Sequence, residues 1–265
     1  MVEKPRGRRG DGGDGRAGGG SGGGGPVDWG AWRGVLATAA ALAIDVDTCR
    51  LGRLERYAGE LRRFGGAFNL GAREAGAVAP EAHCAVSLGV FAVDRPRPGE
   101  RVVDIGSGAG FPGLVVKIVR PDLDLTLVEA GRRRALFLEH VARVLGLEGV
   151  RVLARRAEDL GGGVEWRGAF DLALARAFGP FEVTCEVALP LLRVGGRLVA
   201  YRGPRAEEEA HQAEAFVAEL GGRVGDIMAW APAGEPGVTP LTLVTVHKEG
   251  PTPDRYPRRA ARLGR

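Results

Sequence analysis

The stretch RVVDIGSGAGFPGLVV, residues 101–116, constrains the fold of this chain more than any other segment. A short β-branched run comes first, three glycines follow within five residues, and a second aliphatic run begins just after Pro112. This order predicts a buried strand, a tight turn and a helix with the proline in its first turn. Glycines permit positive φ and carry no Cβ, and the start of a helix offers unpaired N–H groups. We therefore expect a ligand to lie against the main chain of this turn.

The spacing of the glycines leaves two classes of ligand to compare. The pattern G-x-G-x-x-G of dinucleotide-binding folds is met by Gly108, Gly110 and Gly113. In those folds the first glycine leaves the strand directly, whereas here Gly106 holds that place and the pattern read from it breaks at Phe111. Asp104, at the end of the predicted strand, would repel a pyrophosphate but attract a cationic ligand. A Rossmann dehydrogenase is therefore kept only as a distant alternative.

The amino-terminal third of the chain divides into a tail and a helical segment. Residues 1–25 are mostly glycine with scattered charges, so we expect them to be disordered. Residues 26–95 predict three helices: one capped by Asp28, one starting at Asp47, and one covering 80–91. This helical segment precedes the strand that leads into the glycine turn.

Residues 96–249 predict the main domain. Strand and helix patterns alternate five times, and the final two strand patterns, 223–230 and 241–248, are joined only by a loop rich in proline and glycine. Five such units closed by an antiparallel hairpin indicate an α/β protein with the seven-stranded S-adenosylmethionine-dependent methyltransferase fold, a doubly wound, mostly parallel sheet. The expected ligand is therefore S-adenosylmethionine.

The same fold predicts where the cofactor is held. Glu129 ends the second strand, 23 residues after Gly106, where a carboxylate accepts hydrogen bonds from both ribose hydroxyls. Asp104 and Gly108 belong to the same site. Ala157 and Glu158 follow the third strand, at the position that flanks an adenine ring. Both assignments have an alternative without a ligand. Glu129 would then be an ordinary acidic residue at a strand end, and the sequence AEDL would only begin a turn.

Composition and charge bound the class of protein. The net charge is +4, but residues 1–26 carry +2 and the tail 250–265 carries +4, which leaves the body at −2. Basic ends favour a polyanionic partner, although a general preference for arginine over lysine would explain the amino-terminal tail as well. Three widely spaced cysteines indicate neither a disulfide framework nor a metal cluster. The longest apolar run, 35–44, is too short to span a bilayer, so we expect a cytoplasmic protein.

Several short motifs taken together resemble one protein family. They are FNL at 68–70, His83 followed by Ser87 and Leu88, DIGSGAGFPG, VEAGRRRALFL, RAED, ARAF and RYPRR. Over about residues 50–259 the chain is similar to the bacterial small-subunit ribosomal RNA methyltransferase G family, also called glucose-inhibited division protein B. The resemblance implies methyl transfer from S-adenosylmethionine to N7 of one guanosine in 16S rRNA. It implies a monomer that acts on rRNA or the small ribosomal subunit, without a membrane or a metal.

The resemblance also assigns residues. At the cofactor site it places Gly106, Phe111, Glu129, Ala157, Glu158 and Arg176. On the substrate side it places Asn69, His83, Arg202, Arg258 and Arg259. Arg176 and Arg202 are expected to position the reactants with no general base, because guanine N7 already carries an in-plane lone pair.

Three departures from the family pattern concern the RNA side. Gly71 replaces the usual threonine, Val86 replaces an aspartate, and the tail after YPRR ends differently. They leave two alternatives to the rRNA enzyme. One is a related methyltransferase redirected to another RNA or a small molecule, and the other is a non-catalytic RNA-binding relative.

Overall fold

The described residues form a seven-stranded sheet with the strand order β3-β2-β1-β4-β5-β7-β6. The computed structural model describes residue 1 and residues 29–68, 79–235 and 238–258. The strands are β1 (Arg101–Ile105), β2 (Asp124–Val128), β3 (Val150–Leu153), β4 (Phe170–Arg176), β5 (Leu192–Arg202), β6 (Gly222–Trp230) and β7 (Leu241–Lys248). β1 therefore covers the residues that the sequence predicts to form the strand before the glycine turn.

The pairing of the strands gives the sheet two halves. At the centre of the sheet, β1 pairs in parallel with β2 on one side and with β4 on the other. β4 in turn pairs in parallel with β5. β7 is antiparallel to both of its neighbours, β5 and β6. The chain thus adds strands in one direction from β1 to β3, and then returns to add β4 and β5 on the other side. This confirms the predicted doubly wound, mostly parallel α/β sheet with a C-terminal antiparallel hairpin.

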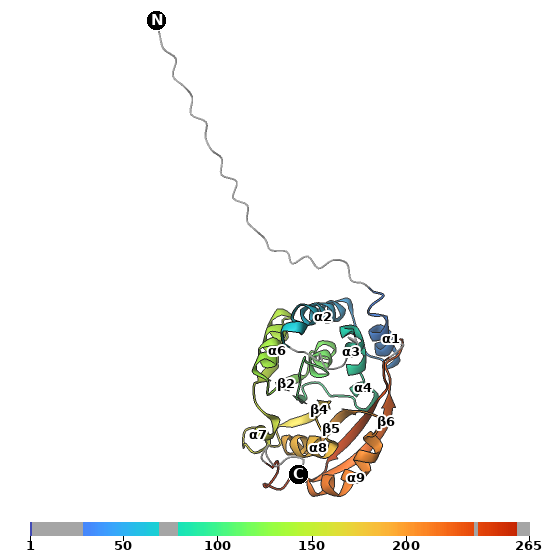
Figure 1. Cartoon of the computed structure of the whole chain (residues 1–265), viewed down its shortest axis with the longest axis vertical. Coiled ribbons are helices and arrows are strands. Elements are labelled where there is room, and N and C mark those ends of the chain that lie inside the picture. Colours follow the sequence, from blue (N-terminus) through green and yellow to red (C-terminus); the bar gives the residue numbers. More distant parts are fainter. Residues whose placement is uncertain (2–28, 69–78, 236–237, 259–265) are drawn as a thin grey trace.

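Helices cover both faces of this sheet (Figure 1), with α1 to α6 on one face and α7 to α9 on the other. They are α1 (Arg33–Ala41), α2 (Thr48–Phe68), α3 (Pro80–Ser87), α4 (Val90–Val93), α5 (Gly113–Val119), α6 (Arg132–Val144), α7 (Ala157–Gly161), α8 (Phe181–Ala188) and α9 (Ala206–Glu219), with a 3₁₀ turn at Leu189–Leu191. Within the described ranges, none of the helices has the length and apolar character needed to cross a membrane.

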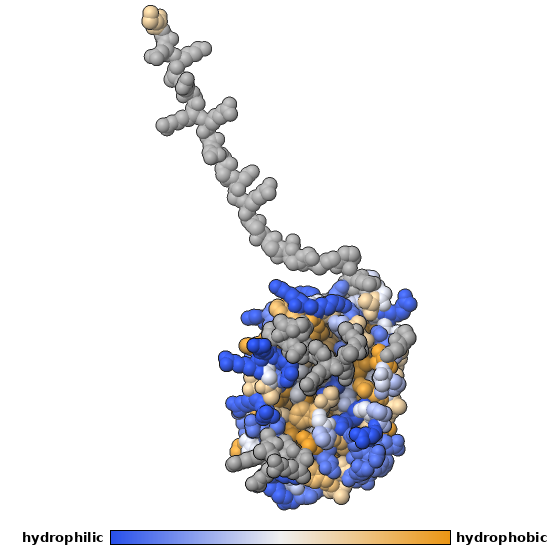
Figure 2. Space-filling view, viewed as in Figure 1, coloured by the Kyte–Doolittle hydropathy of each residue, from blue (hydrophilic) through white to orange (hydrophobic). Residues whose placement is uncertain are grey.

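Alternation along the central strands feeds two hydrophobic cores. Val102 of β1 packs into the core under α1 to α6, and the next residue, Val103, packs into the core under α7 to α9. β4 repeats the pattern with Leu172 and Ala173. Successive side chains of a strand point to opposite faces, so a sheet buried on both sides reads as a continuous apolar run. In the space-filling view, hydrophilic residues dominate the rim of the molecule and hydrophobic ones gather toward the middle (Figure 2).

The amino-terminal helices belong to the first of these cores. Trp32, at the start of α1, and Leu54 of α2 are buried in the same cluster as Leu114 of α5. α2 begins where predicted, since the Asp47 carboxylate accepts a hydrogen bond from the Arg50 N–H at 2.7 Å and caps the helix. The predicted cap at residue 28 lies outside the described residues.

The single helix predicted over 80–91 is wrong, because α3 and α4 are separate helices. Two side chains from the sheet occupy the junction. The Tyr201 hydroxyl accepts a hydrogen bond from the Val90 N–H and donates one to the Ser87 carbonyl, both at 2.7 Å. The Trp230 indole N–H donates to the Val86 carbonyl at 3.1 Å. These bonds satisfy main-chain groups at the break, so the interruption is fixed by tertiary contacts rather than by local sequence.

Candidate functional site

The candidate site lies where the sheet changes direction. β1 and β4 are neighbours, with Ile105 beside Ala175 at their carboxyl ends, and their following segments leave toward opposite halves of the sheet. In open α/β sheets, ligands bind in the crevice outside the carboxyl ends of the strands at such a point. The glycine turn follows β1 at this edge and Arg176 closes β4 beside it. The glycine turn and Arg176, both predicted from the sequence, therefore lie at the expected edge of the sheet.

The glycine turn has a backbone that other residues would not tolerate. Gly106 and Gly110 adopt φ values of +69° and +106°. A Cβ on Gly106 would lie 2.6 Å from Cδ2 of Phe178, and one on Gly110 would collide with Leu114 and with the hydroxyl of Tyr57. The turn is thus held close to its surroundings on one side and keeps its main chain uncovered by side chains of its own.

Asp104 is a fully buried carboxylate at the end of β1. Its Oδ2 accepts a hydrogen bond from the Gly113 N–H at 3.0 Å, while Oδ1 has no hydrogen-bond partner among the residues that the structure describes. Burial raises the pKa of Asp104 to about 7, against the opposing effects of the Gly113 hydrogen bond and the charge of Arg176. A buried acceptor of this kind favours a cationic or hydrogen-bond-donating ligand.

Glu129 ties the glycine turn to the start of α6. Its Oε2 accepts a hydrogen bond from the Gly108 N–H at 3.0 Å. Its Oε1 accepts one from the Gly131 N–H at 2.6 Å and one from the Arg134 guanidinium at 2.7 Å. The side chain lies just beyond β2, as predicted for a ribose ligand, and is 4% exposed. The carboxylate is therefore held in one orientation beside the turn.

Ala157 and Glu158 form the first turn of α7, after β3 and next to the end of β2. Ala157 is buried, and the Glu158 carboxylate lies 3.8 Å from the Arg156 guanidinium. Both residues are thus at the carboxyl edge of the sheet, on the side of Glu129 rather than of Arg176. Their assignment to the adenine end of the cofactor stays a prediction.

A second group of side chains lies on the other side of the turn, where β1 meets β4. The Arg176 guanidinium donates a hydrogen bond to Nδ1 of His83 at 2.8 Å and lies 5.8 Å from the centre of the Phe111 ring. The Phe111 ring also contacts the rings of His83 and Tyr57, with centroids 5.2 and 5.3 Å away. Burial and the charge of Arg176 lower the pKa of His83 to about 4. The imidazole is therefore neutral at neutral pH.

Arg202 lies at the same edge, but its guanidinium is engaged within the protein. It donates to the Gly179 carbonyl and to the Glu209 carboxylate, both at 2.5 Å, and its side chain is 10% exposed. These bonds fix the loop after β4 against the start of α9. Contact between Arg202 and RNA stays a prediction.

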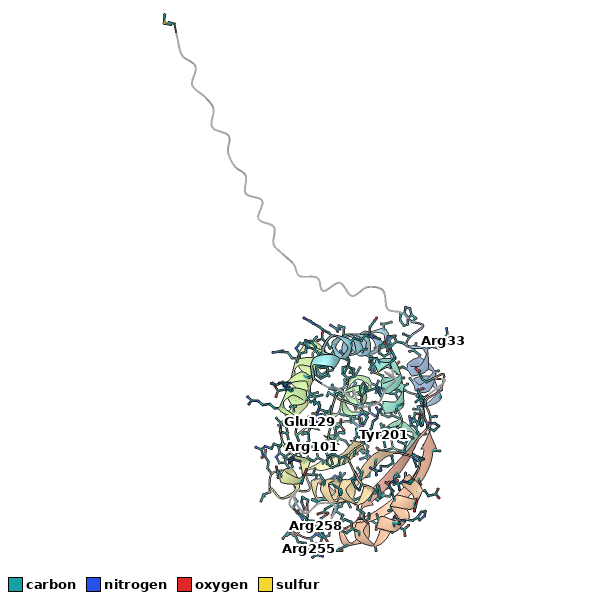
Figure 3. All side chains as sticks on the ribbon, viewed as in Figure 1. Arg33, Arg101, Glu129, Tyr201, Arg255 and Arg258 are labelled. Atoms are coloured by element: carbon teal, nitrogen blue, oxygen red, sulfur yellow. The ribbon has the colours of Figure 1, made fainter. Side chains whose placement is uncertain are left out.

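Arg258 is held at a different place from the glycine turn. Its guanidinium and main-chain N–H all donate to the carboxylate of Glu186, which is completely buried in α8. The preceding segment is bound by Arg167, just before the amino end of β4, through the carbonyl of Tyr256 at 2.9 Å. Figure 3 shows Arg258 and Arg255 together below Glu129. Arg258 thus fixes the last described residues against α8, and any contact with RNA stays a prediction.

Some predicted residues cannot be placed. Asn69, Gly71 and Arg259 lie outside the described residues. Val86, the replacement for the usual aspartate, is 3% exposed and packs in the core under α1 to α6. The replacement of aspartate by valine therefore alters the buried face of α3 and not a surface that RNA could contact.

Two contributors were not predicted from the sequence. Tyr57, on α2, donates a hydrogen bond from its hydroxyl to the Ala109 carbonyl of the glycine turn at 2.7 Å. Arg134 holds Glu129 from the first turn of α6. The motif VEAGRRRALFL contained Arg134 and gave a signal for it, whereas nothing in the local sequence marks Tyr57.

The donors and acceptors of this edge fit S-adenosylmethionine. Glu129 places carboxylate oxygens beside the turn, and the buried Asp104 suits a cationic ligand, while the assignment of Glu129 to the ribose stays a prediction. The turn between them presents main chain without side chains. Together these groups match an adenosine ligand that carries positive charge, as the sequence predicts.

Comparison with known proteins identifies relatives across most of the chain. Residues 50–231 match the family model of rRNA small subunit methyltransferase G. A ribosomal RNA small subunit methyltransferase G from Roseiflexus sp. (strain RS-1) is 40% identical over 230 residues, which cover 84% of this chain and 94% of the relative. The protein of the same name from Symbiobacterium thermophilum is 45% identical over 175 residues, covering 64% of this chain and 70% of the relative.

Among solved structures, a putative transferase from Pyrococcus horikoshii is similar in fold, with a TM-score of 0.50 and 17% identity. The match covers 63% of this chain and 64% of the other. At this identity the likeness concerns the fold only. The family match, the coverage of the Roseiflexus relative and the geometry around the glycine turn agree with the resemblance seen in the sequence, and this chain belongs to the rRNA small subunit methyltransferase G family.

Proposed function

We propose that this chain transfers a methyl group from S-adenosylmethionine to N7 of a guanine in the 16S RNA of the small ribosomal subunit. The observation that carries the proposal is the placement of two buried carboxylates, Asp104 and Glu129, around the glycine turn of a chain that is 40% identical to an rRNA small subunit methyltransferase. A non-catalytic RNA-binding protein would not need both carboxylates around one turn.

The residues divide between holding the cofactor and facing the substrate. When bound, S-adenosylmethionine supplies a methyl group on a positively charged sulfur. Glu129 would accept hydrogen bonds from the ribose, and Asp104, once ionised, would provide negative charge close to the turn. Arg176, the last residue of β4, and His83, which it contacts, lie on the side of β1 away from Glu129 and Ala157. This arrangement favours the cofactor over β1 and β2 and the base near β4.

The chemistry asks the protein for orientation rather than proton transfer. Guanine N7 carries a lone pair in the plane of the ring, so no proton leaves before the new bond forms. Alignment of two reactants contributes about 7–11 kcal/mol in well-oriented systems, which is enough to supply much of the rate. His83 is unsuited to act as a base, since its Nδ1 already accepts a hydrogen bond from Arg176 and its pKa is about 4.

The test is methylation of small subunits from a strain that lacks the gene. We expect N7-methylguanine at one position of 16S rRNA after incubation with the protein and S-adenosylmethionine. Glu129→Ala should raise the dissociation constant of the cofactor about 10- to 100-fold, as expected for lost hydrogen bonds to a charged group. Glu139→Ala, on the exposed side of α6, is the matched control and should bind normally.

The possible outcomes distinguish the proposed rRNA methyltransferase from the two alternatives. Methylation of another RNA or of a small molecule, with small subunits left unmodified, would support a redirected relative. Binding of RNA with no transfer to any acceptor would support the non-catalytic reading. Equal cofactor affinity in Glu129→Ala and the wild type would show that the ribose is held elsewhere.

We also propose a cytoplasmic monomer that needs no metal ion. Methyl transfer to a lone pair requires no activated water. Apart from Met1, the large exposed apolar side chains of the described residues are scattered along the chain: Trp29 before α1, Leu136 and Val144 on α6, Val164 after α7 and Val194 on β5. Light scattering of the purified protein would give the mass of one chain. Full activity should persist after treatment with a chelator.

A further inference from the structure

The contact between Arg176 and His83 fixes which nitrogen of the imidazole carries the proton. A guanidinium has only donors, so Nδ1 of His83 must accept the 2.8 Å hydrogen bond from Arg176. In the neutral ring the remaining hydrogen is then on Nε2. Because burial and the charge of Arg176 lower the pKa of His83 to about 4, the ring keeps this tautomer throughout the neutral range. His83 is therefore a fixed hydrogen-bond donor at Nε2.

The position of the ring is fixed as firmly as its tautomer. Phe111 packs against it, with ring centroids 5.2 Å apart. The hydroxyl of Ser87 donates to the His83 carbonyl at 2.7 Å, and the carbonyl of Ser87 in turn accepts from Tyr201. α3 is thus tied to β5 one turn beyond the histidine. The half-buried ring is held between Phe111, which follows the glycine turn, and Arg176 at the end of β4.

The proposed substrate offers one acceptor for such a donor. The edge of guanine that carries N7 presents two acceptors, N7 and O6, whereas the same edge of adenine presents N7 and an amino donor. N7 must be left free, because its lone pair forms the new bond. Recognition of guanine along this edge therefore falls on O6, which needs a donor.

Building on the proposed function, we propose that His83 donates its Nε2–H to O6 of the target guanine and so selects guanine over adenine. Against adenine, the same N–H would face an amino group and would lose its partner. Arg176 acts here as a positioning residue, since it holds the tautomer of His83.

The neutral state of the ring suits the reaction. Methylation at N7 places a positive charge on the guanine ring. An imidazolium beside O6 would oppose that charge, while a neutral N–H gives a directed hydrogen bond without it. The cation of Arg176 is thus separated from the base by a neutral donor.

The experiment removes the donor and the acceptor separately. Small subunits are reconstituted with 16S rRNA that carries either guanine or 2-aminopurine, which lacks O6, at the position the wild type methylates. The kcat/KM ratio of guanine to 2-aminopurine is measured for the wild type, for His83→Phe and for His83→Gln. The phenylalanine keeps a ring against Phe111 without a donor, and the glutamine keeps an amide donor.

Guanine and 2-aminopurine also differ in intrinsic reactivity. The test is therefore the change in the kcat/KM ratio between the wild type and each variant. We expect the ratio to fall about three- to tenfold from wild type to His83→Phe, the value of one hydrogen bond, and to be partly restored in His83→Gln. A purely structural role would lower both rates equally and leave the ratio unchanged. His83→Leu carries the same test if the phenylalanine variant does not fold.

The failures are distinguishable. A wild type that forms no N7-methylguanine overturns the proposed function itself. A wild type that methylates guanine, with the same ratio in His83→Phe as in the unchanged protein, overturns only the contact between His83 and O6.

Discussion

Asp104 shows at the scale of single residues how burial prepares a site for a charged ligand. Its pKa is raised to about 7 by burial, so the carboxyl is mostly protonated at pH 6 in the folded protein. A bound cation favours the ionised form, and binding below pH 7 must therefore release a proton. The affinity for S-adenosylmethionine should rise as the pH increases from about 5.5 to 7.5 and then level off.

Asp104→Asn should abolish this rise, because the amide has no proton to lose and can still accept the hydrogen bond from the Gly113 N–H. Calorimetry at several pH values, in two buffers of different ionisation enthalpy, measures both the affinity and the protons released. The amino group of the cofactor titrates identically with both proteins and cancels in the comparison. An equal pH dependence in the variant would contradict the role of Asp104.

At the scale of elements, a second prediction concerns stability and rests on the contact between β5 and the junction of α3 and α4. Tyr201→Phe removes the hydroxyl that satisfies the Val90 N–H and the Ser87 carbonyl, at a residue only 2% exposed. Leaving buried main-chain groups unsatisfied costs about 1–3 kcal/mol each, so the free energy of unfolding should fall by about 2–6 kcal/mol. Urea denaturation measures this change.

Tyr256→Phe is the matched control. Its hydroxyl donates to Glu219, whose carboxylate is 42% exposed, so water replaces the lost bond. We expect a loss of roughly 1 kcal/mol or less. Equal losses in the two variants would show that the junction does not depend on Tyr201.

The elements also show where sequence reasoning succeeds and where it stops. The glycine turn, the strand before it and the acid after β2 were predictable, because each follows from a pattern within about 25 residues. The break at Gly89 was not predictable, since the indole of Trp230, 141 positions later, lies where its Cβ would be. The contact of Arg176 with His83 joins residues 93 positions apart. Local periodicity carries no information about such pairs, so their geometry needed the fold.

For the molecule as a whole, the carboxyl-terminal arginines carry one prediction about stability and one about RNA binding. Arg258 serves the interior, as the partner of Glu186, whereas Arg259, Arg262 and Arg265 follow it in the sequence. Replacing these three arginines by serine should leave the stability unchanged. It should reduce the slope of log binding constant against log salt for rRNA by about 2–3, since each lost phosphate contact removes about 0.7–0.9.

Arg258→Met provides the contrast, because it removes the guanidinium from a completely buried carboxylate and leaves only the main-chain N–H of residue 258 as a donor. Because the Arg258 side chain is 36% exposed, water reaches the pair, and we expect a loss of about 1–3 kcal/mol of stability. Filter binding across a range of salt concentrations, together with thermal unfolding, measures both effects. A triple variant that keeps the wild-type salt slope would remove the terminus from the RNA-binding surface.

The partnership of Glu186 with Arg258 also has a consequence for the order of events during synthesis. The two residues are separated by 72 positions, which a ribosome takes about 4–14 s to translate at typical rates. Throughout that interval α8 holds a carboxylate with its intended partner not yet made. The core under α7 to α9 is therefore completed only when the carboxyl-terminal segment has been synthesised. A nascent chain stalled before residue 258 should be cleaved by proteases along α8 and α9.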